Sequence, residues 1–203
     1  TARMISSTQV RVEREDSGNV APNFNWVVVE FDSAKIDSLQ HGSVTVDDKL
    51  YTSPETVTIS AIDTDNSILN FQGRYDKNGC AKTSTTGNIV SSTQIKFYQH
   101  VVFTGYADIE WYVIDFGDCN DSAQRGEIDN DADNTWFTED VTITSVDTSR
   151  AMNFHTMTCK GTGTAYPAAM STAEFTSSTN LRIERKHDGQ KNYIEWQVLE
   201  LPY

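Results

Sequence analysis

One segment of the sequence has residue types and spacing that fit a chemical role, and that role is metal binding. Residues 129–140 read Asp-Asn-Asp-Ala-Asp-Asn-Thr-Trp-Phe-Thr-Glu-Asp. Positions 1, 3, 5 and 12 of a calcium loop need carboxylate oxygens, and here they hold Asp129, Asp131, Asp133 and Asp140. Asn134 takes the turn position that usually holds glycine, whose left-handed backbone asparagine tolerates. A solvated acidic linker explains the same segment, so calcium is one of two hypotheses.

No set of residues in the sequence predicts catalysis. The four histidines are His41, His100, His155 and His187. They follow no repeat, and no nucleophile, base and orienting group can be assembled around them. Motifs for a nucleophile elbow, a phosphate loop or a zinc protease are absent from the sequence. Glu195 and Glu200 point to opposite faces if they share a strand, so they cannot act as a glycosidase pair. We expect a non-enzymatic protein whose only candidate cofactor is calcium.

The elements that would position these residues belong to an internal repeat. Trp26, Trp111 and Trp196 are spaced 85 residues apart, and each begins the pattern Trp-x-Val. A Ser-Ser-Thr block precedes each of them, at residues 6–8, 91–93 and 177–179. A third block occurs twice, at residues 57–64 and 141–148. Such a period indicates an array of one supersecondary unit. We expect the second half of a unit at residues 1–37, then whole units at 38–117 and 118–203.

The repeated blocks are typical of β-strands. Apolar residues alternate with polar ones at Val10 and Val12, at Ile95 and Phe97, and at Leu181 and Ile183. No segment shows a sustained helical stripe, and the chain is rich in Thr, Ser, Val and Asp. The sequence therefore predicts an all-β fold of tandem small antiparallel β-sandwich or barrel units.

Charged residues near these blocks predict a particular strand pairing. If each Ser-Ser-Thr strand forms a hairpin with the following Trp strand, opposite charges face each other in every unit. The predicted pairs are Arg11–Glu30, Lys96–Asp115 and Arg182–Glu200. The tryptophans then lie on the opposite face of their strands, which another layer must cover. We therefore expect Trp26, Trp111 and Trp196 to pack at an interface.

The half unit at the start of the chain needs a partner. A lone hairpin is marginally stable in water and leaves strand edges unpaired. We expect residues 1–31 to be completed either by residues 40–53, which read as a strand, or by a neighbouring chain.

Composition narrows the partners and the location. The net charge of the 203-residue chain is −13, which argues against a nucleic-acid partner because phosphates are repelled. No apolar run is long enough for a transmembrane helix, so no membrane partner is expected. The three cysteines follow no regular spacing, which favours free thiols in a protein made in a reducing cytoplasm.

The Ser-Ser-Thr-Gln-(Val/Ile)-(Arg/Lys) block, followed by Trp-x-Val-x-(Glu/Asp)-(Phe/Leu), resembles the repeated β-modules of phage tail, fibre and head-decoration proteins. The resemblance implies a structural component of a virion or surface assembly that contacts copies of itself and other structural proteins. The sequence is also somewhat similar to H-type lectins, which implies a carbohydrate-binding adhesin that stacks sugars on Trp or Tyr. No lectin binding motif matches. Buried tryptophans would favour the structural protein, and exposed ones beside Asp or Asn the adhesin.

Overall fold

The protein is described by a computed structural model over residues 2–6, 8–12, 30–47, 53–75, 85–99, 106–117, 123–130, 137–159, 171–185 and 191–201. Regular structure there is almost entirely β, with two short 3-10 turns at Ser33–Lys35 and Thr64–Asn66. Every strand pair in these ranges is antiparallel. The prediction of an all-β fold built from small antiparallel sheets is confirmed.

Residues 38–117 form a sandwich of two three-stranded sheets. Its strands are β3 (Ser38–Asp47), β4 (Glu55–Thr58), β5 (Ser67–Tyr75), β6 (Thr86–Ser91), β7 (Gln94–Tyr98) and β8 (Tyr106–Asp115). One sheet has the order β3-β8-β5 and the other the order β4-β7-β6. The chain therefore changes sheet repeatedly, and only β6 and β7 form a hairpin of consecutive strands.

Residues 123–201 form a second sandwich with the same topology. Its strands are β9 (Gln124–Asn130), β10 (Phe137–Thr142), β11 (Ala151–Cys159), β12 (Thr172–Ser177), β13 (Asn180–Arg185) and β14 (Asn192–Glu200). The sheets run β9-β14-β11 and β10-β13-β12. Each strand thus has its counterpart six strands earlier, with β14 equivalent to β8.

A third copy of the consecutive hairpin lies at the start of the chain, in β1 (Ala2–Ser6) and β2 (Gln9–Val12). Its register is irregular before Ser6, which pairs with Gln9, as it is in the β6–β7 and β12–β13 hairpins. In all three turns a threonine N–H donates to the hydroxyl of the serine two residues earlier, at 3.3, 3.3 and 3.2 Å. The Ser-Ser-Thr block therefore encodes the turn of this hairpin, because its hydroxyls satisfy the turn's backbone.

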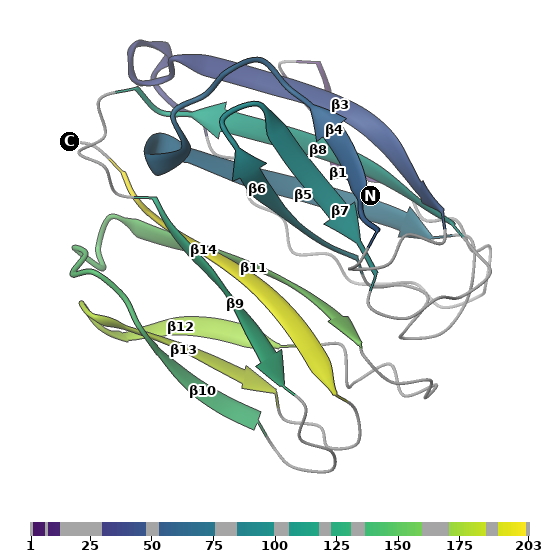
Figure 1. The fold of residues 1–203 in the computed structure, drawn as a ribbon. Coiled ribbons are helices and arrows are strands. Elements are labelled where there is room, and N and C mark those ends of the chain that lie inside the picture. Colours follow the sequence, from purple (N-terminus) through teal and green to yellow (C-terminus); the bar gives the residue numbers. More distant parts are fainter. Residues whose placement is uncertain are drawn as a thin grey trace.

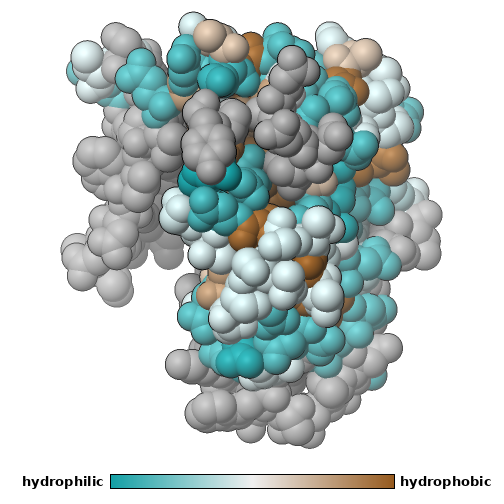
Figure 2. All heavy atoms as spheres, turned by 90° about the vertical axis from the view of Figure 1, so that its left-hand side faces the viewer, coloured by the Kyte–Doolittle hydropathy of each residue, from teal (hydrophilic) through white to brown (hydrophobic). Residues whose placement is uncertain are grey.

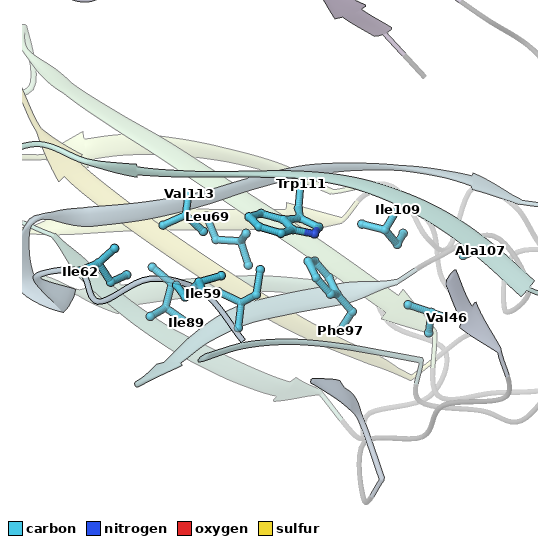
Figure 3. Close-up of a cluster of buried hydrophobic side chains, with 11 residues drawn as sticks. Val46, Ile59, Ile62, Leu69, Ile89, Phe97, Ala107, Ile109, Trp111 and Val113 are labelled. Atoms are coloured by element: carbon cyan, nitrogen blue, oxygen red, sulfur yellow. The ribbon is translucent and has the colours of Figure 1, made fainter. Parts of the chain in front are cut away.

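The core of each sandwich contains the repeated tryptophan. Trp111 and Phe97 lie among aliphatic side chains from both sheets of the first sandwich (Figure 3), and Trp111 is 7% exposed. Trp196 is 8% exposed in the second core, with Leu181 and Ile183 from the facing sheet. These two tryptophans therefore join the sheets within a unit rather than the units to each other. Trp26 lies outside the described residues.

In both sandwiches the predicted hairpin between the Ser-Ser-Thr strand and the following Trp strand is wrong, and the strand predicted around Trp26 lies outside the described residues. Lys96 in β7 pairs with β4 and β6, whereas Asp115 in β8 pairs with β3 and β5. Arg182 in β13 and Glu200 in β14 are separated in the same way. The two strands are the central strands of opposite sheets. The matched charges could not distinguish strands that pair from strands that face each other.

The prediction also assigned the wrong face of the Trp strand to the core, because the tryptophan side points inward. Ile109, Trp111 and Val113 point into the core, while Tyr112 and Ile114 point outward. Opposite β8, the strand β3 includes residues 40–47, so these residues complete the first sandwich and not the β1–β2 hairpin. The proposal that residues 40–53 complete the half unit is therefore wrong for residues 40–47, and residues 48–52 lie outside the described ranges.

The two sandwiches pack against each other, with one sheet of the second sandwich against the side of the first. In Figure 1 the sheet β9-β14-β11 lies between the sheet β10-β13-β12 and the first sandwich. Strand β6 of the first sandwich contacts β11 and β14 of the second. One face of the sheet β9-β14-β11 is therefore the core of its own unit and the other face is an interface.

Candidate functional site: the face between the two sandwiches

Strand β14 is buried along both of its faces. Ile194, Trp196 and Val198 point into the core of the second sandwich. The alternating residues Tyr193, Glu195, Gln197 and Leu199 point toward the first sandwich, and their exposures run from 0% to 6%. A strand whose outer face is polar and yet buried needs a hydrogen-bond partner for each polar group.

Gln197 meets that need at the free edge of β5. Its Oε1 accepts from the Leu69 N–H at 3.0 Å, and its Nε2 donates to the Leu69 carbonyl at 2.8 Å. Leu69 belongs to an edge strand, so its outward backbone groups have no strand partner. One amide side chain of the second unit thus replaces the missing strand of the first.

Glu195 is held by two side chains of the first sandwich. Its Oε1 accepts from Asn88 Nδ2 at 2.9 Å and from the Tyr98 hydroxyl. Tyr98 lies 5.8 Å from Tyr193, measured between ring centroids, and Tyr193 donates to Glu127. Burial raises the pKa of Glu195, and burial together with the Glu195 charge raises the pKa of Tyr98. The cluster is a buried polar network that fixes the second unit on the first.

Apolar and backbone contacts complete the interface. Ile68, Phe116 and Leu199 form a buried cluster shared by both units, and Phe31 packs edge-on against Phe116 at 5.0 Å. Arg125 donates to the Ser67 carbonyl at 2.7 Å, and burial lowers the pKa of Arg125. Just before β9, the Ala123 N–H donates to the Asp65 carbonyl of the first sandwich at 2.8 Å.

The first sandwich has an equivalent outer face, on the sheet β3-β8-β5. There the positions of Glu195 and Gln197 are taken by Glu110 and Tyr112. Leu39 is 56% exposed on this face, and His41 stacks on Tyr112 at 5.9 Å. Within the described residues, the second sandwich reaches only one end of this sheet face, where Ile68 and Ile114 belong to the cluster with Leu199.

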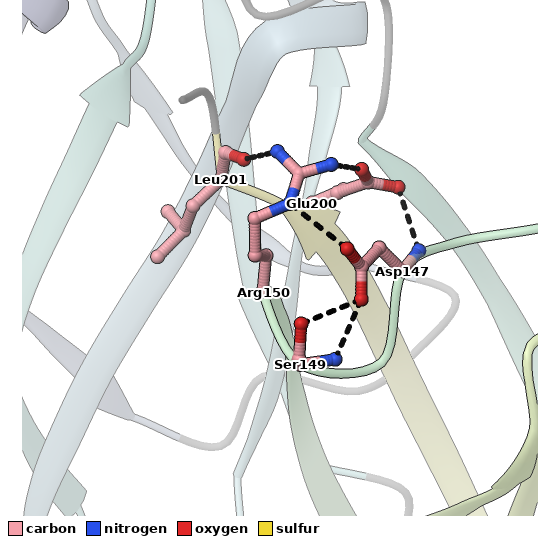
Figure 4. Close-up of polar contacts among 5 residues, drawn as sticks. All are labelled: Asp147, Ser149, Arg150, Glu200 and Leu201. Atoms are coloured by element: carbon pink, nitrogen blue, oxygen red, sulfur yellow. Dashed lines mark hydrogen bonds and ion pairs between the residues drawn. The ribbon is translucent and has the colours of Figure 1, made fainter.

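In the two sandwiches, the charged residues predicted to pair with each other contact other groups. Arg182 forms a two-bond pair with Asp140 at 2.9 and 3.0 Å, which lowers the pKa of the Asp140 carboxyl. Glu200 is bound by Arg150 (Figure 4), and Lys96 lies over the Tyr98 ring at 5.0 Å. Arg11 is opposite Arg3 in the β1–β2 register, and Glu30 is exposed outside any strand.

The calcium hypothesis for residues 129–140 stays a prediction. Asp131 and Asp133 lie outside the described residues. Asp129 is in β9 and Asp140 in β10, which belong to different sheets, and Asp140 already binds Arg182. In the part of the chain that the structure describes, no group of three or more His, Cys, Asp or Glu side chains is arranged to hold a metal.

The two described histidines each contact neighbouring residues of their own sheet or sandwich. His155 lies beside Trp196 in the register, its Nε2 is 3.2 Å from the Ser171 carbonyl, and burial lowers its pKa. His41 is on the outer face described above, and His100 and His187 lie outside the described residues. None of the described helices is long and apolar enough to cross a membrane.

No protein-family model, curated protein or solved structure matches the chain. The fold defines a protein of tandem all-β sandwich units. Its function is therefore argued from its own surfaces and contacts.

Proposed function

We propose that the chain is a non-enzymatic structural protein of a virion or surface assembly, whose β-modules contact neighbouring subunits. The observation that supports this is the interface at β14, where one module buries the outer face of a central strand against the side of another. That contact uses an edge-capping amide, a polar cluster and shared apolar residues. Modules that join in this manner within a chain can join between chains by the same physics.

The outer face of the sheet β3-β8-β5 is the surface we assign to a neighbouring subunit. It is the counterpart of the interface on the second unit, and Leu39 and Tyr106 are among its exposed large hydrophobic side chains. On the side of the molecule shown in Figure 2, the described residues are mostly hydrophilic, and hydrophobic ones form small patches between them. Such a surface, with a net charge of −13, suits specific contacts rather than general adhesion.

Sedimentation velocity over concentrations from about 1 to 200 µM tests the proposal. We expect a concentration-dependent multimer, and we expect Leu39→Arg to weaken association at least about tenfold, which is 1.4 kcal/mol. Val90→Arg is the matched control, since Val90 is 53% exposed but lies on β6, outside this face. A chain that remains monomeric at every concentration, and is absent from purified native particles, would contradict the proposal.

A carbohydrate-binding adhesin is the second candidate. The buried Trp111 and Trp196 cannot serve as stacking platforms, but the His41–Tyr112 pair offers an aromatic surface beside the exposed Asn70. Titration calorimetry with a panel of glycans distinguishes the adhesin from the structural protein. Binding that Tyr112→Ala abolishes would favour the adhesin, whereas binding that Tyr112→Ala leaves unchanged would exclude this surface.

A further inference from the structure

The second sandwich ends in a cluster built around one guanidinium group. Arg150 donates from Nε to Asp147 at 3.2 Å, from Nη1 to the Leu201 carbonyl at 2.9 Å, and from Nη2 to Glu200 (Figure 4). Glu200 also accepts from the Asp147 N–H at 3.0 Å. A single cation thus neutralises two carboxylates and binds the carbonyl that follows β14.

The first sandwich repeats this frame with one difference. Asp115 accepts from the Asp63 N–H at 3.0 Å, as Glu200 does from Asp147. The Phe116 N–H donates to the carbonyl of residue 66 at 3.0 Å, and the Leu201 N–H to that of Arg150 at 3.1 Å. Residue 66, the counterpart of Arg150, is asparagine. The first sandwich therefore retains the backbone arrangement and both acids, but it has no side chain equivalent to the Arg150 guanidinium.

Asp63 accepts from the Asn66 amide at 3.1 Å and from the Asp65 N–H at 3.0 Å, but Asp115 and the Asn66 amide oxygen are short of partners. Asp115 and Asn66 are each 6% exposed, and Asp115 Oδ1 and Asn66 Oδ1 have no hydrogen-bond partner. Among the described residues no basic side chain forms an ion pair with Asp63 or Asp115. Arg125 donates to the Ser67 carbonyl instead, and its charge partner is Asp65. A buried carboxylate oxygen without a donor or counter-charge is strongly unfavourable.

We propose that the end of the first sandwich binds a calcium ion through Asp63, Asp115 and Asn66, in the place that the Arg150 guanidinium takes in the second. Two carboxylates and an amide oxygen are hard donors of the kind calcium prefers, and water can complete its six to eight ligands. The Phe116 carbonyl, equivalent to the Leu201 carbonyl, is a further donor. Asn66 and Asp115 are shorter than Arg150 and Glu200, so the ion replaces side-chain atoms that this unit lacks.

The test is the thermal stability of the full chain in calcium and in chelator. In 5 mM calcium we expect the melting temperature to rise by at least about 3 °C over its value in EDTA, because a ligand that binds only the folded state stabilises it. Magnesium should give a smaller rise, since its octahedral geometry fits such a site poorly. Asn66→Arg should raise the melting temperature in EDTA and remove the response to calcium.

Two further variants separate this site from other acids. Asp131→Asn/Asp133→Asn should leave the calcium response intact, which excludes the acidic segment as its source. Asp63→Asn keeps the side-chain shape and should remove the response, so it decides the question if Asn66→Arg does not fold. Absence of any rise in wild type, or a full response in Asp63→Asn, would overturn the proposal.

Discussion

At the scale of single residues, each core tryptophan is matched to a glycine on the neighbouring strand. Gly42 is opposite Trp111 and Gly126 is opposite Trp196. A β-carbon at these glycines would lie 2.7 and 2.6 Å from the indole Cζ2. The indole therefore lies flat over a strand position that only glycine leaves open.

Gly42→Ala should lower the free energy of unfolding by about 1–3 kcal/mol, because the added methyl group overpacks the core. Urea denaturation measures this change. Ser43→Ala, on the exposed face of the same strand, should change the free energy by less than about 0.5 kcal/mol. Equal effects of the two substitutions would show that the glycine–indole contact is not responsible.

Glu195 makes the stability of the interface depend on pH. Burial raises its folded-state pKa, and the hydrogen bonds from Tyr98 and Asn88 only partly oppose this. Below the unfolded pKa, about 4.3, both states are protonated and the stabilisation is fully present. It is lost as pH rises through the folded pKa, because the folded state must then carry a buried charge.

The free energy of unfolding of wild type minus that of Glu195→Gln should therefore fall as pH rises from about 4 upward. The difference isolates Glu195 from the other carboxyl groups, such as Asp108 and Asp147, whose pKa values are lowered by hydrogen bonds. Urea titrations at several pH values measure it. A difference that stays flat or rises with pH would contradict the assignment.

At the scale of the strands, the same glutamine device is used in two environments. Gln40 binds the backbone N–H and carbonyl of Ser60 at 2.7 and 3.0 Å near the surface, and Gln124 does the same for Thr144 at 2.6 and 3.0 Å. Gln197 makes the same pair of bonds to Leu69 in a buried setting. The first two fix the crossing between sheets, and the third joins two units.

Gln197→Ala should cost about 1–3 kcal/mol for each Leu69 backbone group left without a partner, since water cannot reach them. Gln40→Ala removes two hydrogen bonds of the same kind, but water replaces them, so it should cost less. Thermal or urea unfolding of both variants gives the comparison. The interpretation of Leu69 as a buried, capped edge fails if Gln40→Ala is the more damaging change.

At the scale of the whole molecule, the shared cluster of Ile68, Phe116 and Leu199 should couple the two sandwiches. We expect a single calorimetric transition in wild type, with equal calorimetric and van't Hoff enthalpies. Leu199→Asp places a charge in this cluster and should split the transition in two. Leu39→Asp, on the exposed outer face, should leave it single. Two transitions already in wild type would show that the units unfold independently.

The sequence by itself determined the strand content, the period and the turn that recurs. Period-2 alternation and the Ser-Ser-Thr blocks depend on local chemistry, so they can be read without neighbours. The glycines at 42 and 126 also recur at one repeat position, and that spacing could have indicated the strands that pair with the Trp strands in the same sheet.

Only the tertiary structure decided which strands pair, which face of β8 and β14 is the core, and what covers the other face. Both faces of these strands carry large apolar residues, so composition gives no preference for either face, because burial by a second sheet and burial by a second unit both select such residues. The charges of Lys96 and Asp115 fitted a hairpin equally well, since facing strands and pairing strands share the same alternation. The roles of Gln197 and Glu195 depend on contacts with Leu69, Asn88 and Tyr98, which are far away in the sequence, and such contacts exist only once the units have folded and stacked.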